Sequence, residues 1–241
     1  MRRLAPLFLF LGAVFAPALF ADEEYSVGYM YKVPLADLLP TQFAVSKREV
    51  AVRLKTIEGK DEDGDIKKYK KKKVGLAVVG PGGKLYLVDG HHFASALFAY
   101  EHNKMYVEIE ADLSDLSPAA FWKKMKANHW VYLKDHKGKP IDVSELPKEI
   151  SALKDDPYRG VAWMVRKCGG YKELDVPFQE FEWAEFFREH LTIAVNASDA
   201  TWEKVVRQAL ELAASDEASH LAGWTGRSVK CADIFAALGD D

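Results

Sequence analysis

The sequence contains none of the short motifs that identify the most common nucleotide-binding and hydrolytic sites. It has no Walker loop, no GxSxG elbow, no GxGxxG before a helix and no HExxH pair. Its two cysteines, Cys168 and Cys231, lack CxxC spacing, which argues against a zinc–thiolate site. Neither an internal repeat nor a heptad array is present. Any functional site must therefore be identified from its local context.

The chain also has little excess charge. It carries 33 Lys and Arg residues against 36 Asp and Glu residues, a formal net charge of −3. A slightly acidic chain is a poor candidate for tight binding to nucleic acid, which depends on neutralising phosphates. Hydrophobic residues make up 49% of the chain and aromatic residues 12%, which argues against general disorder. A chain of 241 residues can bury a large core, as one domain or as two small ones.

Only one run of the sequence is apolar enough to engage a membrane, and it lies at the N-terminus. Two arginines precede the run Leu4–Ala21, three acidic residues follow it, and small residues allow cleavage after Ala18 or Ala21. This pattern predicts a secretory signal peptide over residues 1–21; the alternative is an uncleaved anchor, for which the run is marginal. We therefore expect a secreted or periplasmic protein without stable membrane insertion after cleavage. In an oxidising compartment the two cysteines could pair or remain buried thiols.

One short turn combines several chemically active side chains. The apolar run Leu85–Val88 ends in Asp89 and Gly90, His91 and His92 follow, and a helical pattern then begins. Backbone N–H groups at the start of a helix favour an anion, and the imidazoles and carboxylate could bind a phosphate, hold a metal ion or move a proton. Adjacent residues at a helix start point in different directions, so we expect only one histidine to face a ligand. The alternative is a tight turn in which a histidine caps a carbonyl.

The first half of the mature chain predicts an α+β domain over residues 25–112. Its lysine run, Lys67–Lys73, could be a solvated face or a polyanion contact. Ser46 and Glu49 have the spacing of a capping box. The expected elements are a helix over Ser46–Ile57, a charged loop over Gly59–Lys73, two strands at Leu76–Val79 and Leu85–Val88 that form a hairpin, a helix over Ala94–Tyr100, and a third strand at Met105–Ala111.

After residue 112 the pattern becomes mostly helical, which predicts an appended helical region over residues 113–241. Aromatic residues at helical spacing are expected to form its core. Arg159, Arg166 and Arg188 lie among them, either for internal ion pairs or to reach a ligand phosphate. The expected elements are helices at about 118–128, 157–167, 178–191 and 200–214, and a short β-like run at His129–Leu133.

Two parts of this pattern together resemble a known group. The segment Val33–Gln42 (VPLADLLPTQ), the strand pair and the segment Val88–His92 (VDGHH) are similar to the ParB/sulfiredoxin superfamily, most closely to its exported ParB-like nuclease branch. The later stretch from Asp156 to Trp183 resembles the same branch. The resemblance extends from about Tyr31 to Leu191. It implies a ParB/sulfiredoxin-like α+β fold with an appended helical region.

The resemblance also implies a phosphate cradle at the histidine turn. Gly90, Thr41 and Gln42 would line the phosphate, Asp89 would orient a histidine or hold a divalent ion such as Mg²⁺, and His91 or His92 would be the acid/base or a phosphate donor. The implied activity is that of a nuclease, or of a nucleotide phosphohydrolase or phosphotransferase. Its partner would be a nucleotide or a nucleic acid.

Departures from the superfamily favour a different class of function. Many relatives have an arginine after the histidines, where this chain has Phe93 and so lacks a fork of donors. The free-serine kinases have an acidic base near the position of Gln42, and an amide cannot take a proton. No cysteine like that of the sulfiredoxins lies near the turn. The alternative is therefore a non-catalytic periplasmic binding or interaction module on the same fold.

A phosphate site without its own arginine needs positive charge from elsewhere. A guanidinium matches the geometry of a phosphate, so we predict that Arg159 or Arg166 approaches Asp89 or the two histidines. The lysines at Lys70–Lys73 could supply charge from a mobile loop, at a higher cost in conformational entropy.

Overall fold

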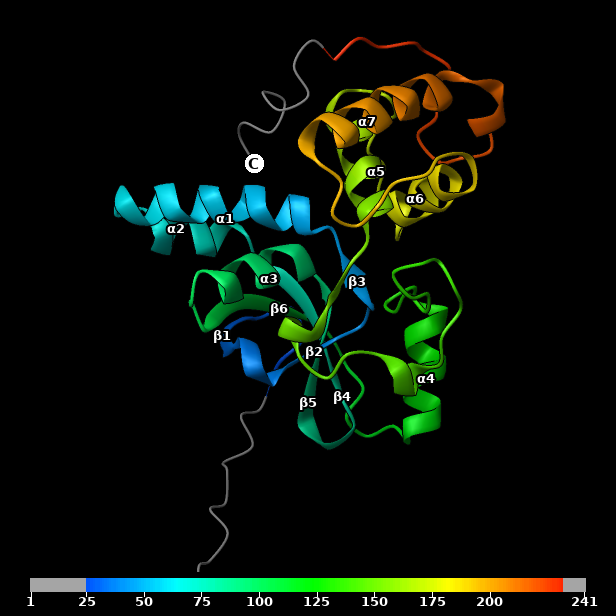
Figure 1. The fold of residues 1–241 in the computed structure, drawn as a ribbon. Coiled ribbons are helices and arrows are strands. Elements are labelled where there is room, and N and C mark those ends of the chain that lie inside the picture. Colours follow the sequence, from blue (N-terminus) through cyan, green and yellow to red (C-terminus); the bar gives the residue numbers. More distant parts are fainter. Residues whose placement is uncertain (1–24, 232–241) are drawn as a thin grey trace, which may run out of the picture.

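A computed structural model describes residues 25–231, so the predicted signal peptide over residues 1–21 lies outside the described residues. A five-stranded mixed sheet forms the centre of the first half (Figure 1). Its strand order is β1-β6-β4-β5-β2, in which β6 and β4 pair in parallel, as do β5 and β2, and the other pairs are antiparallel. The strands are β1 (Met30–Pro34), β2 (Leu38–Pro40), β4 (Gly75–Gly80), β5 (Lys84–Asp89) and β6 (Lys104–Asp112). The predicted α+β class and the antiparallel hairpin are confirmed.

Alternation along the two central strands separates the two faces of the sheet. Ala77 and Leu87 contribute to a core under α3 (His91–Ala99) and α1 (Lys47–Glu62). Val78 belongs to a second core, which contains Phe121 and Met125 of α4 (Pro118–Ala127). The sheet is therefore covered on both faces, with α1 lying over α3 on one side and α4 on the other (Figure 1).

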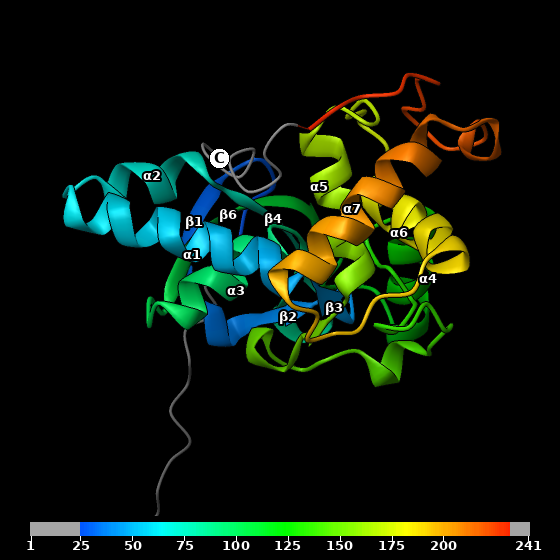
Figure 2. The same cartoon turned by 45° about the horizontal axis from the view of Figure 1, so that its top comes forward.

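The segment Gly59–Lys73, predicted as a charged loop, is mostly helical. α1 continues to Glu62, and α2 (Ile66–Lys72) follows after a short turn (Figure 2). Tyr69 of α2 is buried and meets the ring of Phe93 edge-on, at 5.8 Å between ring centroids. Lysine is a good helix former, and Tyr69 together with the partly buried Ile66 packs this short helix against the core.

The core of the first half extends beyond residue 112, where the sequence predicted a boundary. Val131 and Leu146 join α4 on the second face of the sheet. The strand β3 (Ala44–Val45) pairs in parallel with β7 (Lys154–Asp155), which ties this later segment to the first half. The packing therefore changes at about Asp155. The run His129–Leu133 is not a strand, and the nearest pairing is a single bridge between Lys134 and Pro140.

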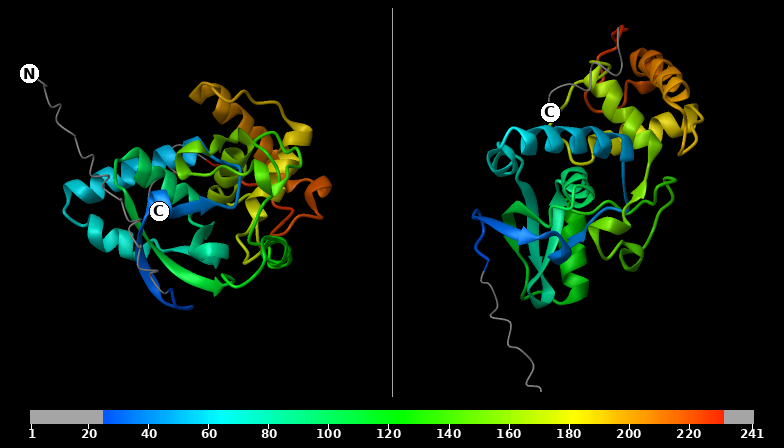
Figure 3. Two further views of the ribbon diagram at one scale, coloured as in Figure 1. Left: turned by 90° about the horizontal axis from the view of Figure 1, so that it is seen from below. Right: turned by 60° about the vertical axis from the view of Figure 1, so that its left-hand side comes forward.

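Three helices build a separate core above α1 (Figure 3). They are α5 (Pro157–Lys167), α6 (Gln179–His190) and α7 (Asp199–Ala214). The predicted aromatic core is confirmed: Trp163, Trp183 and Phe187 are fully buried, and Tyr171 stacks on Trp183 at 4.2 Å between ring centroids. Short 3₁₀ turns complete the chain at Leu35–Asp37, Pro81–Gly83, Val143–Glu145, Ile150–Ala152 and Asp216–Ala218.

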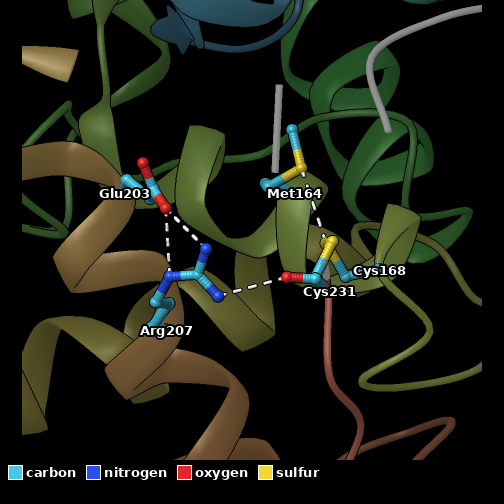
Figure 4. Close-up of a disulfide and its surroundings, with 5 residues drawn as sticks. All are labelled: Met164, Cys168, Glu203, Arg207 and Cys231. Carbon is cyan, nitrogen blue, oxygen red and sulfur yellow. Dashed lines mark hydrogen bonds and ion pairs between the residues drawn. A yellow bond between two sulfur atoms is a disulfide. The ribbon is translucent and has the colours of Figure 1, made fainter. Parts of the chain in front are cut away.

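A disulfide joins Cys168, just after α5, to Cys231 (Figure 4). Their Cα atoms lie 5.4 Å apart across a sequence separation of 63 residues. Arg207 of α7 donates a hydrogen bond to the carbonyl oxygen of Cys231 at 3.1 Å and also pairs with Glu203. Of the two alternatives that the sequence left open for the cysteines, the structure has the pair.

Candidate functional site

The predicted strand-to-helix turn is confirmed and depends on a glycine. β5 ends at Asp89 and α3 begins at His91. Gly90 has a φ of 94°, and a Cβ atom there would lie 3.1 Å from the Cα of Gly75. No side chain caps α3, and the N–H of Ala94 donates to the Gly90 carbonyl at 2.9 Å. The turn thus presents the start of a helix without a side-chain cap, the arrangement that favours an anion.

The ring of His91 is directed away from solvent, toward the loop after β2. The backbone N–H of Thr41 donates to its Nε2 at 3.2 Å. The hydroxyl of Thr41 donates to the carbonyl of Leu87 at 2.8 Å. His91 is only 3% exposed, and this burial lowers its pKa to about 3. The imidazole is therefore neutral near pH 7, with the lone pair of Nε2 already used.

His92 makes a similar contact with the end of the same loop. The backbone N–H of Ser46 donates to its Nε2 at 2.9 Å, and the residue is 9% exposed. Burial, and then the charge of Arg159, holds the pKa of His92 well below its usual range. Because Nε2 accepts this hydrogen bond, the ring proton lies on Nδ1. We predicted that one histidine would face a ligand; both rings instead hold the loop 41–46 against α3.

Asp89 is separate from both imidazoles. It is exposed, and we find no hydrogen bond or ion pair between its carboxylate and another residue of the range 25–231. It therefore orients neither histidine in this structure. Within the same range, no three His, Cys, Asp or Glu side chains are grouped so that they could hold a metal ion. Asp89 offers a single carboxylate beside the start of α3.

Thr41 and Gln42, expected to line a phosphate, are both buried. The side-chain amide of Gln42 donates to the carbonyl of Ala44 at 2.7 Å. The N–H of Tyr132 donates to the carbonyl of Thr41 at 2.9 Å. The polar groups of this loop are thus largely satisfied within the protein, and they fix its shape.

The two predicted arginines differ in what they reach. Arg159 lies near the histidine turn: its Nη1 is 3.2 Å from Oε2 of Glu49, and the same oxygen is 3.4 Å from Nε2 of His92. Arg166 instead pairs with Glu173 and, at 3.0 Å, with Glu180. The prediction that one arginine approaches the histidines is confirmed for Arg159.

The charge of Arg159 is already engaged in internal ion pairs, one of the two roles that the sequence left open for this arginine. Besides Glu49, it faces Glu180 at 3.6 Å, and its side chain is buried. Glu49 also pairs with Arg53 at 2.8 Å. Glu49 therefore joins α1 to α5 through Arg159, next to the ring of His92. In the sequence, only the capping-box spacing between Ser46 and Glu49 pointed to this residue. One of the two hydrogen bonds of that box is present, because Ser46 Oγ accepts from the N–H of Glu49, but the Glu49 carboxylate pairs with the arginines instead.

Comparisons with known proteins place this geometry in a family. A family model described as "Putative ParB-like nuclease" matches residues 31–189. No curated protein matches the chain. Among solved structures, the crystal structure of protein Atu1540 from Agrobacterium tumefaciens is similar, with a TM-score of 0.74 and 31% sequence identity. That likeness covers 83% of this chain and 98% of the other.

Proposed function

This chain belongs to the ParB-like nuclease family, within the ParB/sulfiredoxin superfamily, and on that premise we propose that it binds the phosphate of a nucleotide or nucleic acid at the start of α3. One observation carries the proposal. Gly90 turns the chain into α3 in a left-handed conformation that favours glycine, and no side chain caps the start of the helix by a hydrogen bond. Gly90, His91 and His92 then contribute backbone N–H groups, which bind phosphate by hydrogen bonds and by the helix dipole.

In this proposal the two histidines are positioning residues. A general base needs a pKa near the operating pH and a free lone pair. Burial lowers the pKa of both rings, and Nε2 of each already accepts a backbone N–H. Their contribution is to hold Thr41, Gln42 and the rest of the loop 41–46 beside the start of α3. Arg159 acts on the same loop indirectly, through Glu49.

Hydrolysis of the bound phosphate ester, as the family description suggests, would then depend on Asp89. It is the exposed acidic group next to the turn, where it can accept a proton or orient water. A single carboxylate is not a preformed site for Mg²⁺, so we assign no step to a metal ion.

A second candidate is a binding module without catalysis. It is favoured by the histidines, whose ring nitrogens already accept backbone hydrogen bonds, by Gln42 in place of an acidic residue, and by the burial of Phe93, which provides no donor.

Either function is proposed for a secreted or periplasmic protein, and the disulfide between Cys168 and Cys231 supports that location. Within residues 25–231, no helix is both long and apolar enough to cross a bilayer.

The binding proposal is tested by NMR, following backbone amides while inorganic phosphate or a nucleoside monophosphate is added. We expect the largest shifts at Gly90, His91 and His92. A titration that leaves these three amides unmoved at millimolar ligand would contradict the proposal.

Catalysis is tested with labelled DNA, RNA and nucleotides, each with Mg²⁺, Mn²⁺ or a chelator. If Asp89 is catalytic, Asp89→Asn abolishes cleavage, whereas Asp115→Asn, the matched change at another exposed aspartate, does not. If the protein only binds, no cleavage is seen, and Asp89→Asn tightens binding because it removes a negative charge next to the phosphate.

A further inference from the structure

A hollow lined by lysines lies at the opposite end of α3 from Gly90. Its lining comprises Lys32 of β1, Lys70 of α2, Lys104 of β6 and the turn 101–103 after α3, and its volume is about 210 Å³. α2 lies beside β6, which brings these residues together from distant parts of the sequence (Figure 2).

Lys70 is buried although it is charged. It is 9% exposed, and we find no hydrogen bond or ion pair between its ammonium group and another residue of the described range. Burial and the nearby charge of Lys32 lower its pKa, while Asp61 acts in the opposite direction. Lysines are seldom buried without a partner, because desolvation disfavours the charge. A lysine held here beside a second lysine indicates that a negative group completes the site.

His102, which also lines the hollow, carries a second unsatisfied polar group. Its Nδ1 is buried without a hydrogen-bond partner among the described residues. Burial and the charges of Lys70 and Lys32 lower the pKa of its ring, and Asp61 raises it. Glu101 is the one carboxylate in the lining, and no ion pair joins it to the three lysines within residues 25–231. More cationic groups than anionic groups therefore face the hollow.

We propose that this hollow is a second anion site, which binds a phosphate group of inorganic phosphate or of a nucleoside monophosphate. Phosphate oxygens accept charge-assisted hydrogen bonds from the ammonium groups of Lys32, Lys70 and Lys104, the three lysines of the lining. The nine-residue helix α3 separates this site from Gly90 by about 14 Å. The second site is thus independent of the function proposed at the start of α3.

The test measures the melting temperature and, by calorimetry, the affinity for inorganic phosphate and for AMP, against chloride at matched ionic strength. Phosphate also stabilises proteins by exclusion from their surface, so variants are needed. Lys70→Met is expected to weaken binding about tenfold or more. Lys71→Met, at an exposed lysine of the same helix, is the matched control and is expected to bind like the unaltered protein.

A folding defect cannot mimic the expected result. Because Lys70→Met removes a buried charge, its melting temperature in chloride should not fall, while the rise with phosphate should be smaller than in the unaltered protein and in Lys71→Met. Lys104→Met, at an exposed lining residue, should also weaken binding. If Lys70→Met weakens the binding of AMP, and the unaltered protein binds AMP more tightly than phosphate, a nucleotide is the source of the phosphate in the hollow. The proposal would be overturned if phosphate raised the melting temperature equally in the unaltered protein and in Lys70→Met, or in neither. The NMR shifts at Gly90 test only the site at the start of α3, so the two proposals can fail separately.

Discussion

His92 accepts the backbone N–H of Ser46 through Nε2 at 2.9 Å, across 46 positions of sequence. The neighbouring residue, His91, makes the equivalent bond with Thr41 at 3.2 Å. The two bonds attach both ends of the loop 41–46 to the first turn of α3. This pair of contacts gives the histidine turn a structural role whatever its ligand, and it has measurable consequences.

Replacing either histidine should destabilise the fold. His91→Ala or His92→Ala leaves a buried backbone N–H without an acceptor, which costs about 1–3 kcal/mol. Urea denaturation of each variant measures this loss. His220→Ala, at an exposed histidine, is the control and should change stability by less than about 0.5 kcal/mol. Histidine variants as stable as the control would contradict the hydrogen-bonded geometry.

The buried histidines should make the protein sensitive to acid. The pKa of His91 is about 3 when folded, against an ordinary value of 6.5, and that of His92 is lowered in the same direction. Between these pH values the unfolded chain binds more protons than the folded chain, so stability falls as the pH decreases from 6.5. The fall due to His91 has a slope of about 1.4 kcal/mol per pH unit and levels off near pH 3.

This pH dependence is checked by denaturation at a series of pH values between 4 and 8. His91→Gln keeps an acceptor but cannot titrate. Below pH 6.5 the free energy of unfolding of this variant should therefore fall less steeply, with a slope smaller by about 1.4 kcal/mol per pH unit, which corresponds to one proton. The same slope in His91→Gln and in the unaltered protein would show that His91 is not neutral in the fold.

Breaking the buried contact at Glu49 should be costly. Glu49→Gln leaves the buried guanidinium of Arg159 with less compensation, and breaking a buried pair costs about 3–5 kcal/mol. Glu203→Gln removes the more exposed pair with Arg207, which is worth about 0–1 kcal/mol. Thermal and urea unfolding of the two variants give the comparison. Equal losses would mean that Glu49 does not hold α1 and α5 together.

The parts of the fold that the sequence predicted are those determined locally. The run Leu85–Val88, the Asp89–Gly90 turn and the following helix come from hydrophobic periodicity and from a glycine at a positive φ, and each depends on neighbouring residues only. The aromatic core of α5 and α6 follows from helical spacing in the same way. The resemblance in Val33–Gln42 and Val88–His92 indicated the family.

The parts that were missed depend on contacts between distant segments. The lysine-rich segment is a helix because Tyr69 packs on Phe93, a contact that no local pattern shows. The sequence predicted that the region after residue 112 is separate from the first half. In the structure α4, which belongs to that region, covers the sheet of the first half, because β4 and β5 have apolar residues on both faces. The pairing of both histidines with backbone N–H groups also requires the folded path of the loop 41–46.

The disulfide should contribute strongly to stability. It closes a loop across a sequence separation of 63 residues, and the entropy lost by the unfolded chain corresponds to about 4 kcal/mol for a loop of that length. We expect Cys168→Ser with Cys231→Ser to lower the free energy of unfolding by about 2–4 kcal/mol under non-reducing conditions. A reducing agent should destabilise the unaltered protein but leave the double variant unchanged. Thiol titration of the denatured protein, purified from an oxidising compartment, should detect no free cysteine. Two free thiols and no effect of the reductant would contradict the pairing, and with it the support that the disulfide gives to a secreted or periplasmic location.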